Sequence, residues 1–224
     1  MSNKRSNVYI ATLPRSGSTM LGMMLNAHHE IFHIGESSYW GKLNPEHIKC
    51  SCGKVGCDIL IAIYQMIHTS YNVNSIYETC QLIDRIEESE KVYHKLSLPD
   101  DDAISHDVSS LNRLIEASCR GLEDLADSFR SIVEKGIIID NTKSIYIGER
   151  IVKRNNWKVI LLTRDPRGLA YSNKKAGERK GVPRPVDHKI SVYINFSKKA
   201  SSLIDLPNVL HVRYEDLCIN PKKI

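Results

Sequence analysis

Short apolar runs alternate along this chain with longer segments in which apolar residues recur at helical spacing. The runs have the length and composition of buried strands, and they occupy residues 7–13, 31–34, 136–140, 157–163 and 209–213. The spacing predicts helices over residues 18–28, 59–70, 74–95, 109–135 and 188–204, with another helix beginning near Pro166. This alternation predicts an α/β fold, with a parallel sheet of about five strands flanked by helices.

The size of the chain fits one domain. Its 224 residues are 42% hydrophobic, which is enough for a substantial core, so we expect a single domain over residues 1–224. Residues 58–135 form a predicted helical insertion, which either shapes a substrate site or simply covers the sheet. Two polar stretches are expected to be loops, namely the acidic residues 98–102 and the charged, glycine- and proline-rich residues 177–187.

The first strand leads into a turn with the composition of a phosphate-binding loop. Residues 14–19 read Pro-Arg-Ser-Gly-Ser-Thr and precede an apolar helical segment. Backbone N–H groups that converge at the start of a helix bind anions, and Gly17 allows the chain to turn tightly there. The usual nucleoside triphosphate loop carries a lysine directly after its second glycine. Here Ser18 stands at that position, and the cation of the loop is Arg15.

A second cation follows a different strand. Arg164 comes directly after the apolar run at 157–163, and Ser172 lies two turns into the helix that begins near Pro166. Guanidinium groups form paired hydrogen bonds with phosphate oxygens. Since both residues belong to one strand–helix unit, they are candidates for binding a second phosphate.

Together these two motifs resemble those of the sulfotransferase superfamily, from about Val8 to Pro221. The resemblance implies in-line transfer of a sulfuryl group from 3′-phosphoadenosine 5′-phosphosulfate (PAPS) to an acceptor hydroxyl or amine, a reaction that needs no metal. It implies that Arg164 and Ser172 bind the 3′-phosphate of this donor. The 5′-phosphosulfate would be bound by the loop residues Arg15, Ser16, Gly17, Ser18 and Thr19.

The same resemblance implies three catalytic residues. Arg15 would stabilise charge on the leaving phosphate, and Lys143, after the third strand, would act at the bridging oxygen. Glu36 lies in a segment similar to that of protein-tyrosine sulfotransferases, where a glutamate is the general base. His33 is the alternative base, since a neutral imidazole can accept a proton near neutral pH. Asp140 is expected to be structural or to organise Lys143.

A compact group of cysteines has two interpretations. Three thiols and one imidazole can bind zinc tetrahedrally, and this weak metal candidate comprises His47, Cys50, Cys52 and Cys57. The close spacing of Cys50 and Cys52 favours a loop feature or a disulfide instead. The remaining cysteines are expected to be ordinary buried residues, and they are Cys80, Cys119 and Cys218.

Charge and hydropathy limit the expected partners. The formal net charge of +5 suits a polyanionic nucleotide, but no basic run marks a nucleic-acid surface. The first strand begins close to Met1 and no apolar stretch reaches about 18 residues, so we expect a cytoplasmic protein without a membrane anchor. The acceptor could be a small molecule, a carbohydrate, a lipid or a peptide. The sequence indicates no oligomeric state.

Two other functions fit parts of the pattern. The first is a P-loop nucleotide kinase, against which Ser18 counts because a kinase needs the loop lysine. The second is a non-catalytic nucleotide-binding protein of the same fold. In similar proteins at least one more helix follows the element at 213–221, so we expect a C-terminal segment to be missing here.

Overall fold

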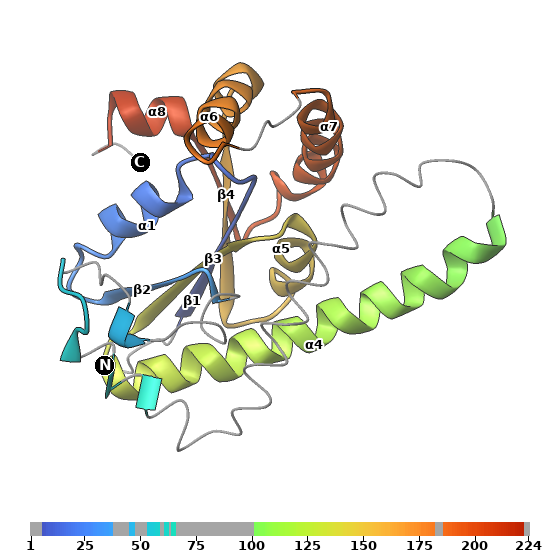
Figure 1. The fold of residues 1–224 in the computed structure, drawn as a ribbon. Coiled ribbons are helices and arrows are strands. Elements are labelled where there is room, and N and C mark those ends of the chain that lie inside the picture. The colour runs from blue at the N-terminus through green and yellow to red at the C-terminus, as the bar shows by residue number, and fades with distance from the viewer. Residues whose placement is uncertain are drawn as a thin grey trace.

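The fold is built around a parallel sheet with the strand order β2-β3-β1-β4-β5 in the described part of the chain (Figure 1). The computed structural model describes residues 6–37, 45–47, 53–58, 61–62, 64–65, 101–181 and 186–221. The strands are β1 (Ser6–Thr12), β2 (Ile31–Gly35), β3 (Ile137–Lys143), β4 (Trp157–Thr163) and β5 (Val209–Arg213). The predicted α/β class with a parallel sheet of about five strands is confirmed.

Helices cover both faces of this sheet (Figure 1). The helices with described bounds are α1 (Ser18–Leu25), α4 (Asp101–Val133), α5 (Ile145–Ile151), α6 (Pro166–Arg179), α7 (Val186–Leu203) and α8 (Tyr214–Ile219), and a 3₁₀ helix spans Pro45–His47. Helices α1 and α8 pack on one face, over a core of Ile10, Leu21, Ile139, Leu162, Val212 and Leu217. Helices α4, α5 and α7 pack on the other face, over a core that includes Tyr9, Phe129, Ile138, Ile147, Trp157 and Phe196.

Strand β1 lies at the centre of the sheet. Its residue Val8 is paired with Ile139 of β3 on one side and with Lys158 of β4 on the other. Because the strands are parallel, their C-terminal ends meet at one edge of the sheet, where ligands bind in folds of this type. The chain segments that follow β1, β3 and β4 therefore emerge side by side, which brings the two phosphate motifs to the same place.

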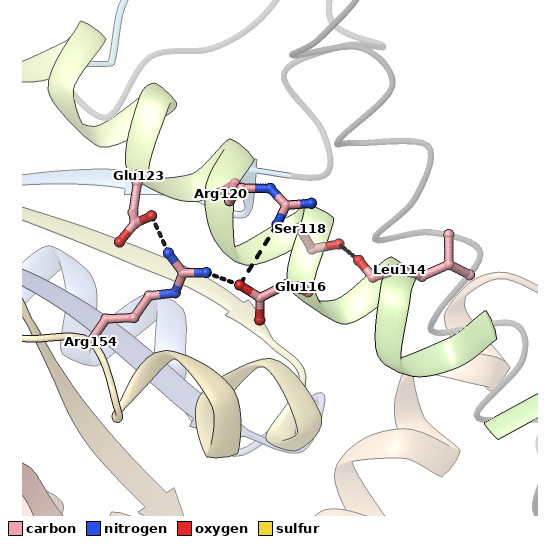
Figure 2. A network of polar contacts seen from close by, with 6 residues as sticks. All are labelled: Leu114, Glu116, Ser118, Arg120, Glu123 and Arg154. Carbon is pink, nitrogen blue, oxygen red and sulfur yellow. Dashed lines mark hydrogen bonds and ion pairs between the residues drawn. The ribbon is translucent and has the colours of Figure 1, made fainter. Parts of the chain in front are cut away.

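The long helix α4 is held to the sheet by a polar network as well as by its apolar face. Arg154, which precedes β4, forms ion pairs with Glu116 and Glu123 of α4 (Figure 2). Arg120 approaches the same Glu116 carboxylate at 3.8 Å but is largely exposed. Burial is the main cause that raises the pKa of Glu123, and the Arg154 guanidinium opposes it. Arg154 thus allows two carboxylates to lie against the body of the protein.

Some predicted boundaries were wrong. Helix α4 begins at Asp101, so Asp101 and residue 102 form its first turn instead of a loop at 98–102. Carboxylates in a first turn are favoured by the helix dipole, which explains why acidic residues start this helix. The loop predicted at 177–187 is shorter, because α6 continues to Arg179 and α7 begins at Val186.

Other sequence predictions fall on parts of the chain that the structure does not describe. The helix predicted at 74–95 lies entirely outside the described residues, and the helix predicted at 59–70 lies mostly outside them. The helical insertion over 58–135 is therefore seen mainly through α4 and stays a prediction as a whole. Helices α5 and α8 were not predicted. They are seven and six residues long, too short to show a clear helical period.

Candidate active site

The segment between β1 and α1 has the backbone of an anion-binding loop. Arg15 and Gly17 have left-handed conformations, with φ of 75° and 91°, and Ser16 between them does not. Such an alternation turns successive N–H groups toward one side and forms a concavity for an anion. Ser16 and Ser18 are buried, whereas Arg15 and Thr19 are exposed. The serines belong to the interior of the loop, while the Arg15 side chain is accessible to a ligand.

An aromatic ring from a distant part of the sequence packs against Gly17 and leaves no space for a side chain there. A Cβ atom at Gly17 would lie 2.4 Å from Cδ2 and Cε2 of Tyr214, a contact that real Cβ atoms do not make. Tyr214 is the first residue of α8 and directly follows β5. Glycine is therefore required at position 17 by two independent features, its positive φ and the ring packed against it.

Arg164 joins the second phosphate motif to the first. Its guanidinium carbon lies 4.1 Å from the centroid of the Tyr214 ring, which is a favourable cation–π distance. Its Nη1 donates a hydrogen bond to the backbone carbonyl oxygen of Arg15 at 2.7 Å. On its other side, a Cβ atom at Gly168 would lie 3.1 Å from the Arg164 Nε atom. The side chain is thus held between the loop, α8 and α6.

Ser172 shares a face of α6 with the residue that contacts Arg164. Gly168 and Ser172 are four positions apart, so they lie one above the other on the helix surface. Ser172 is partly exposed. The structure therefore places Ser172 one turn beyond the Arg164 guanidinium, on the same side of α6.

The turn after β4 is fixed by acidic side chains. Asp165 caps α6, and its Oδ1 accepts a hydrogen bond from the Arg167 backbone N–H at 2.8 Å. Hydrogen bonding to Arg167 lowers the pKa of Asp165 to about 2. The Asp165 backbone N–H in turn donates to Oε1 of Glu215, the second residue of α8, at 2.9 Å. Helix α8 therefore contacts both the loop at β1 and the turn at β4.

Glu36 and Lys143 lie together at the other side of the loop. The Lys143 ammonium forms an ion pair with Oε1 of Glu36. Their side chains are only 12% and 27% exposed, respectively, so the pair is largely shielded from water. Lys143 is the last residue of β3 and has a left-handed φ of 84°. Two of the residues proposed for catalysis are thus brought into contact, although one follows β2 and the other ends β3.

Buried hydrogen bonds hold the backbone beneath this pair. The Ser37 N–H donates to Oδ2 of Asp140 at 3.2 Å and to Oγ1 of Thr142 at 3.0 Å. The hydroxyl oxygens of Ser37 and Thr142 lie 2.7 Å apart and share a hydrogen bond. The Thr142 N–H donates to Oδ1 of Asp140 at 2.8 Å. Ser37 and Thr142 are the neighbours of Glu36 and Lys143 in sequence. Asp140 therefore ties together the two segments that carry the ion pair.

His33 does not belong to this ion pair. Its ring packs against α1, where a Cβ atom at Gly22 would lie 2.4 Å from the His33 Cε1 and Nε2 atoms. The pKa of His33 is lowered, mainly by burial. Hydrogen bonding with Asn141 acts to raise this pKa, and the nearby positive charge of Lys143 acts to lower it further. Within the described part of the chain, the buried Nε2 has no hydrogen-bond partner. The imidazole thus lies against α1 with its Nε2 atom buried.

The cysteine predictions are only partly covered. Cys50 and Cys52 lie outside the described residues, while His47 is exposed and Cys57 is buried. The described residues contain no group of three metal-ligating side chains. Because Cys50 and Cys52 are not among them, the zinc, loop and disulfide interpretations all stay predictions. Cys119 is buried as expected, and Cys80 is outside the described part. Cys218 was predicted to be buried but is exposed, because α8 packs on the sheet through Leu217.

Sequence reasoning missed two residues of this site, Tyr214 and Glu215. Both follow directly after β5, whose C-terminal end lies at the same edge of the sheet as Arg164. An aromatic residue immediately after a predicted strand is the signal that could have identified Tyr214. Local sequence pattern does not indicate that the ring packs on Gly17, because that contact depends on the order of the strands.

Comparison with known proteins identifies a family for this chain. A family model described as "Sulfotransferase domain" matches residues 5–224. A search of curated proteins gives no match. No helix among the described residues combines the length and apolar character needed to cross a membrane.

Three solved structures are similar to the chain. The "Sulfotransferase Domain from the Curacin Biosynthetic Pathway" is 18% identical, with a TM-score of 0.49 over 98% of this chain and 71% of that chain. The sulfotransferase domain of the Synechococcus PCC 7002 olefin synthase is also 18% identical, with a TM-score of 0.48 over 98% and 69%. A sulfotransferase from Alicyclobacillus acidocaldarius is 12% identical, with a TM-score of 0.45 over 97% and 76%. Since the family model spans nearly all of the sequence, the chain belongs to the sulfotransferase domain family.

Proposed function

We propose that this protein is a PAPS-dependent sulfotransferase that transfers a sulfuryl group to an acceptor hydroxyl or amine. Membership of the sulfotransferase domain family supports the reaction type. The observation that carries the choice of donor is the hydrogen bond from the Arg164 side chain to the Arg15 carbonyl oxygen. It makes one continuous site out of two phosphate motifs, which suits a nucleotide with phosphate groups at both its 3′ and 5′ positions.

The loop residues fit the sulfated end of such a donor. Backbone N–H groups at the start of α1 and the accessible Arg15 side chain bind the 5′-phosphosulfate in this proposal. Arg164 and Ser172 bind the 3′-phosphate, which a guanidinium group can contact through two hydrogen bonds. When bound, the donor supplies an activated sulfuryl group. Arg15 then stabilises the negative charge that develops on the leaving phosphate.

The ion pair at the ends of β2 and β3 accounts for the acceptor side of the reaction. The acceptor oxygen forms a bond to sulfur while the bond from sulfur to the bridging oxygen breaks, and 3′-phosphoadenosine 5′-phosphate leaves. Glu36 accepts the proton of the acceptor hydroxyl. Lys143 stabilises charge on the bridging oxygen. Because these side chains are already in contact, the base and the cation are positioned together.

Calorimetric titration with 3′-phosphoadenosine 5′-phosphate tests the donor site. We expect micromolar or tighter binding to the wild-type protein and little binding of ATP with magnesium. Arg15→Ala and Arg164→Ala each remove a charged hydrogen-bond donor, which typically costs about 1.5–3 kcal/mol, so affinity should fall by roughly ten- to a hundredfold.

Arg167→Ala is the matched control. Arg167 lies in the same turn as Arg164, but its side chain is 90% exposed and pairs only with Asp165 among the contacts described. Its loss should leave affinity for 3′-phosphoadenosine 5′-phosphate within about twofold of wild type. Unchanged affinity in both site variants would contradict the assignment. Tight binding of ATP with magnesium in place of the bisphosphate would point to a nucleotide kinase.

A further inference from the structure

A cavity of about 310 Å³ lies beside the phosphate-binding loop. The described residues that line it come from the end of the β1 loop and from helices α6 and α7, and they are Leu13, Pro14, Pro166, Leu169, Ala170, Asn173, Ile190, Val192 and Tyr193. None of these carries a charge, and only Asn173 and Tyr193 offer polar side-chain atoms. A volume at the lower end of the roughly 300–1,000 Å³ range of ligand pockets indicates a small, mainly apolar occupant.

The cavity and the proposed phosphate site lie on different faces of α6. Leu169, Ala170 and Asn173 have the spacing of one helix face and line the cavity. Gly168 and Ser172 form another face, and Arg164 packs against Gly168. Helix α6 therefore separates the cavity from the residues proposed to bind the 3′-phosphate. An uncharged cavity on the far side of that helix is unsuited to a phosphate group.

One wall of the cavity nevertheless reaches the start of the phosphate-binding loop, where the proposed function places the sulfuryl group of the donor. Leu13 and Pro14 line the cavity, and the next residue is Arg15, whose side chain is accessible. A molecule seated in the cavity thus ends beside the start of the phosphate-binding loop. A hydroxyl group at that end would face the loop, while the rest of the molecule would contact apolar side chains.

We propose that this cavity binds the apolar body of the acceptor, and that the acceptor is a small alcohol with an alkyl chain. This inference rests on the proposed sulfotransferase function. The lining excludes a carbohydrate body, since the many hydroxyl groups of a sugar would lose their hydrogen bonds to water and find few partners here. An alkyl chain loses no hydrogen bonds on entering the cavity and gains from the removal of its surface from water.

The first test is a series of unbranched primary alcohols from butanol to octanol. Binding is measured by saturation-transfer NMR titration, on protein saturated with 3′-phosphoadenosine 5′-phosphate and on free protein. Burial of one methylene group should increase affinity about fourfold, so affinity should rise along the series until the cavity is full. Methyl glucoside serves as the polar probe. Affinity that does not depend on chain length, or tighter binding of methyl glucoside than of octanol, would overturn the inference.

The second test fills the cavity. Ala170→Phe places a ring among the lining residues, and Lys175→Phe adds the same ring at an exposed position on another face of the same helix. We expect octanol to bind at least about tenfold more weakly to A170F and equally well to K175F. Should A170F fail to fold, Ile190→Ser removes part of the apolar wall at a side chain that is 53% exposed, and it should weaken octanol binding severalfold. Full octanol affinity in the folded cavity variants would contradict the proposal.

The two proposals can fail separately. Both cavity variants should bind 3′-phosphoadenosine 5′-phosphate within about twofold of wild type, because the cavity and Arg164 lie on different faces of α6. Binding of the bisphosphate without any alcohol binding would refute the acceptor inference alone. If the wild-type protein does not bind the bisphosphate, the donor assignment is refuted. The alcohol titration on protein without bisphosphate would then still decide whether the cavity binds an alkyl chain.

Discussion

The guanidinium group of Arg164 lies over the ring of Tyr214, with 4.1 Å between the guanidinium carbon and the ring centroid. The same guanidinium bonds to the Arg15 carbonyl oxygen, so the ring supports a cation that connects two chain segments. Tyr214 itself is held against the loop by its contact with Gly17. The last described helix is therefore part of the proposed donor site, although it carries no phosphate motif.

Replacing Tyr214 should weaken donor binding through Arg164. In Tyr214→Ala the guanidinium loses its aromatic support, worth about 0.5–2 kcal/mol, so affinity for 3′-phosphoadenosine 5′-phosphate should fall between two- and thirtyfold, roughly. Tyr214→Phe keeps the ring and should retain wild-type affinity in the same calorimetric titration. Equal losses in both variants would show that the hydroxyl group, and not the ring, is what matters.

Adding one carbon at Gly17 should damage the loop more than a similar change elsewhere. Gly17→Ala combines a positive φ, which costs about 1–2 kcal/mol for an L-residue, with the Cβ contact at 2.4 Å to Tyr214. Gly181→Ala is the control, because Gly181 has a φ of 65° but nothing within 4 Å of an added Cβ. Denaturant unfolding should show a larger loss of stability for G17A, and only G17A should lose bisphosphate binding. Normal binding by G17A would contradict the described loop geometry.

Glu36→Gln should separate donor binding from transfer. The amide cannot accept the acceptor proton, and general bases typically contribute about 10²–10⁴-fold to rate, so turnover with the best alcohol acceptor should fall by at least a hundredfold, roughly. Bisphosphate affinity should stay within about twofold of wild type. Glu30→Gln, at an exposed position just before β2, should retain full activity. A Glu36→Gln variant with full turnover would remove Glu36 as the base.

Arg154→Ala should destabilise the attachment of α4. Without the guanidinium, Glu123 loses its ion pair with Arg154 and Glu116 keeps only its longer contact with Arg120, so the loss of charged hydrogen bonds should cost about 1–3 kcal/mol in the free energy of unfolding near neutral pH. The loss should shrink as pH falls, because protonated carboxyl groups need no cation. Arg120→Ala should change stability little, since that side chain is 63% exposed and approaches Glu116 only at 3.8 Å. Equal effects of both substitutions in urea unfolding would argue against this role.

The buried carboxyl group of Asp140 predicts a pH dependence of stability. Burial raises its pKa to about 6 from an ordinary value of 3.8, although hydrogen bonds from Thr142 and Ser37 oppose the shift. The folded protein therefore binds this proton more tightly than the unfolded chain does. Its contribution to the free energy of unfolding is present below about pH 4 and is lost as pH rises through about 6.

Comparison with Asp140→Asn isolates this contribution. The amide does not titrate, so the stability of wild type relative to the variant should be greater at pH 4 than at pH 7, by up to roughly 3 kcal/mol. Urea unfolding of both proteins across this range measures the difference. A difference that is independent of pH would show that Asp140 titrates alike in the folded and unfolded states.

The local pattern of the sequence was sufficient for the sheet and the two motifs. The bounds of β4 and β5 were predicted to the residue, because each is a short, mainly apolar run that follows an asparagine and leads to an arginine. The tight turn between β1 and α1, for which we propose phosphate binding, was recognisable because glycine, serine and a cation directly follow a strand. Helices α5 and α8 were missed because two turns or fewer show little periodicity.

The contacts across the site could not be predicted in the same way. The pairing of Glu36 with Lys143 and the packing of Tyr214 on Gly17 both join residues that are far apart in the sequence. These contacts depend on β1 lying between β3 and β4, and on β5 lying beside β4. No single segment contains the information on strand order, so reasoning from local pattern could identify the separate residues but not the contacts between them.

Arg15 and Lys143 share the left-handed backbone that is normally left to glycine, with φ of 75° and 84°. Glycine at Arg15 would relieve about 1–2 kcal/mol of strain and would remove a proposed functional cation at the same time. At Lys143 the same change would also break the shielded ion pair with Glu36, so the relief of strain would be offset there. Variants selected only for heat resistance would therefore gain at Arg15 while losing turnover, and directed evolution of this protein toward durability should need an activity screen in every round.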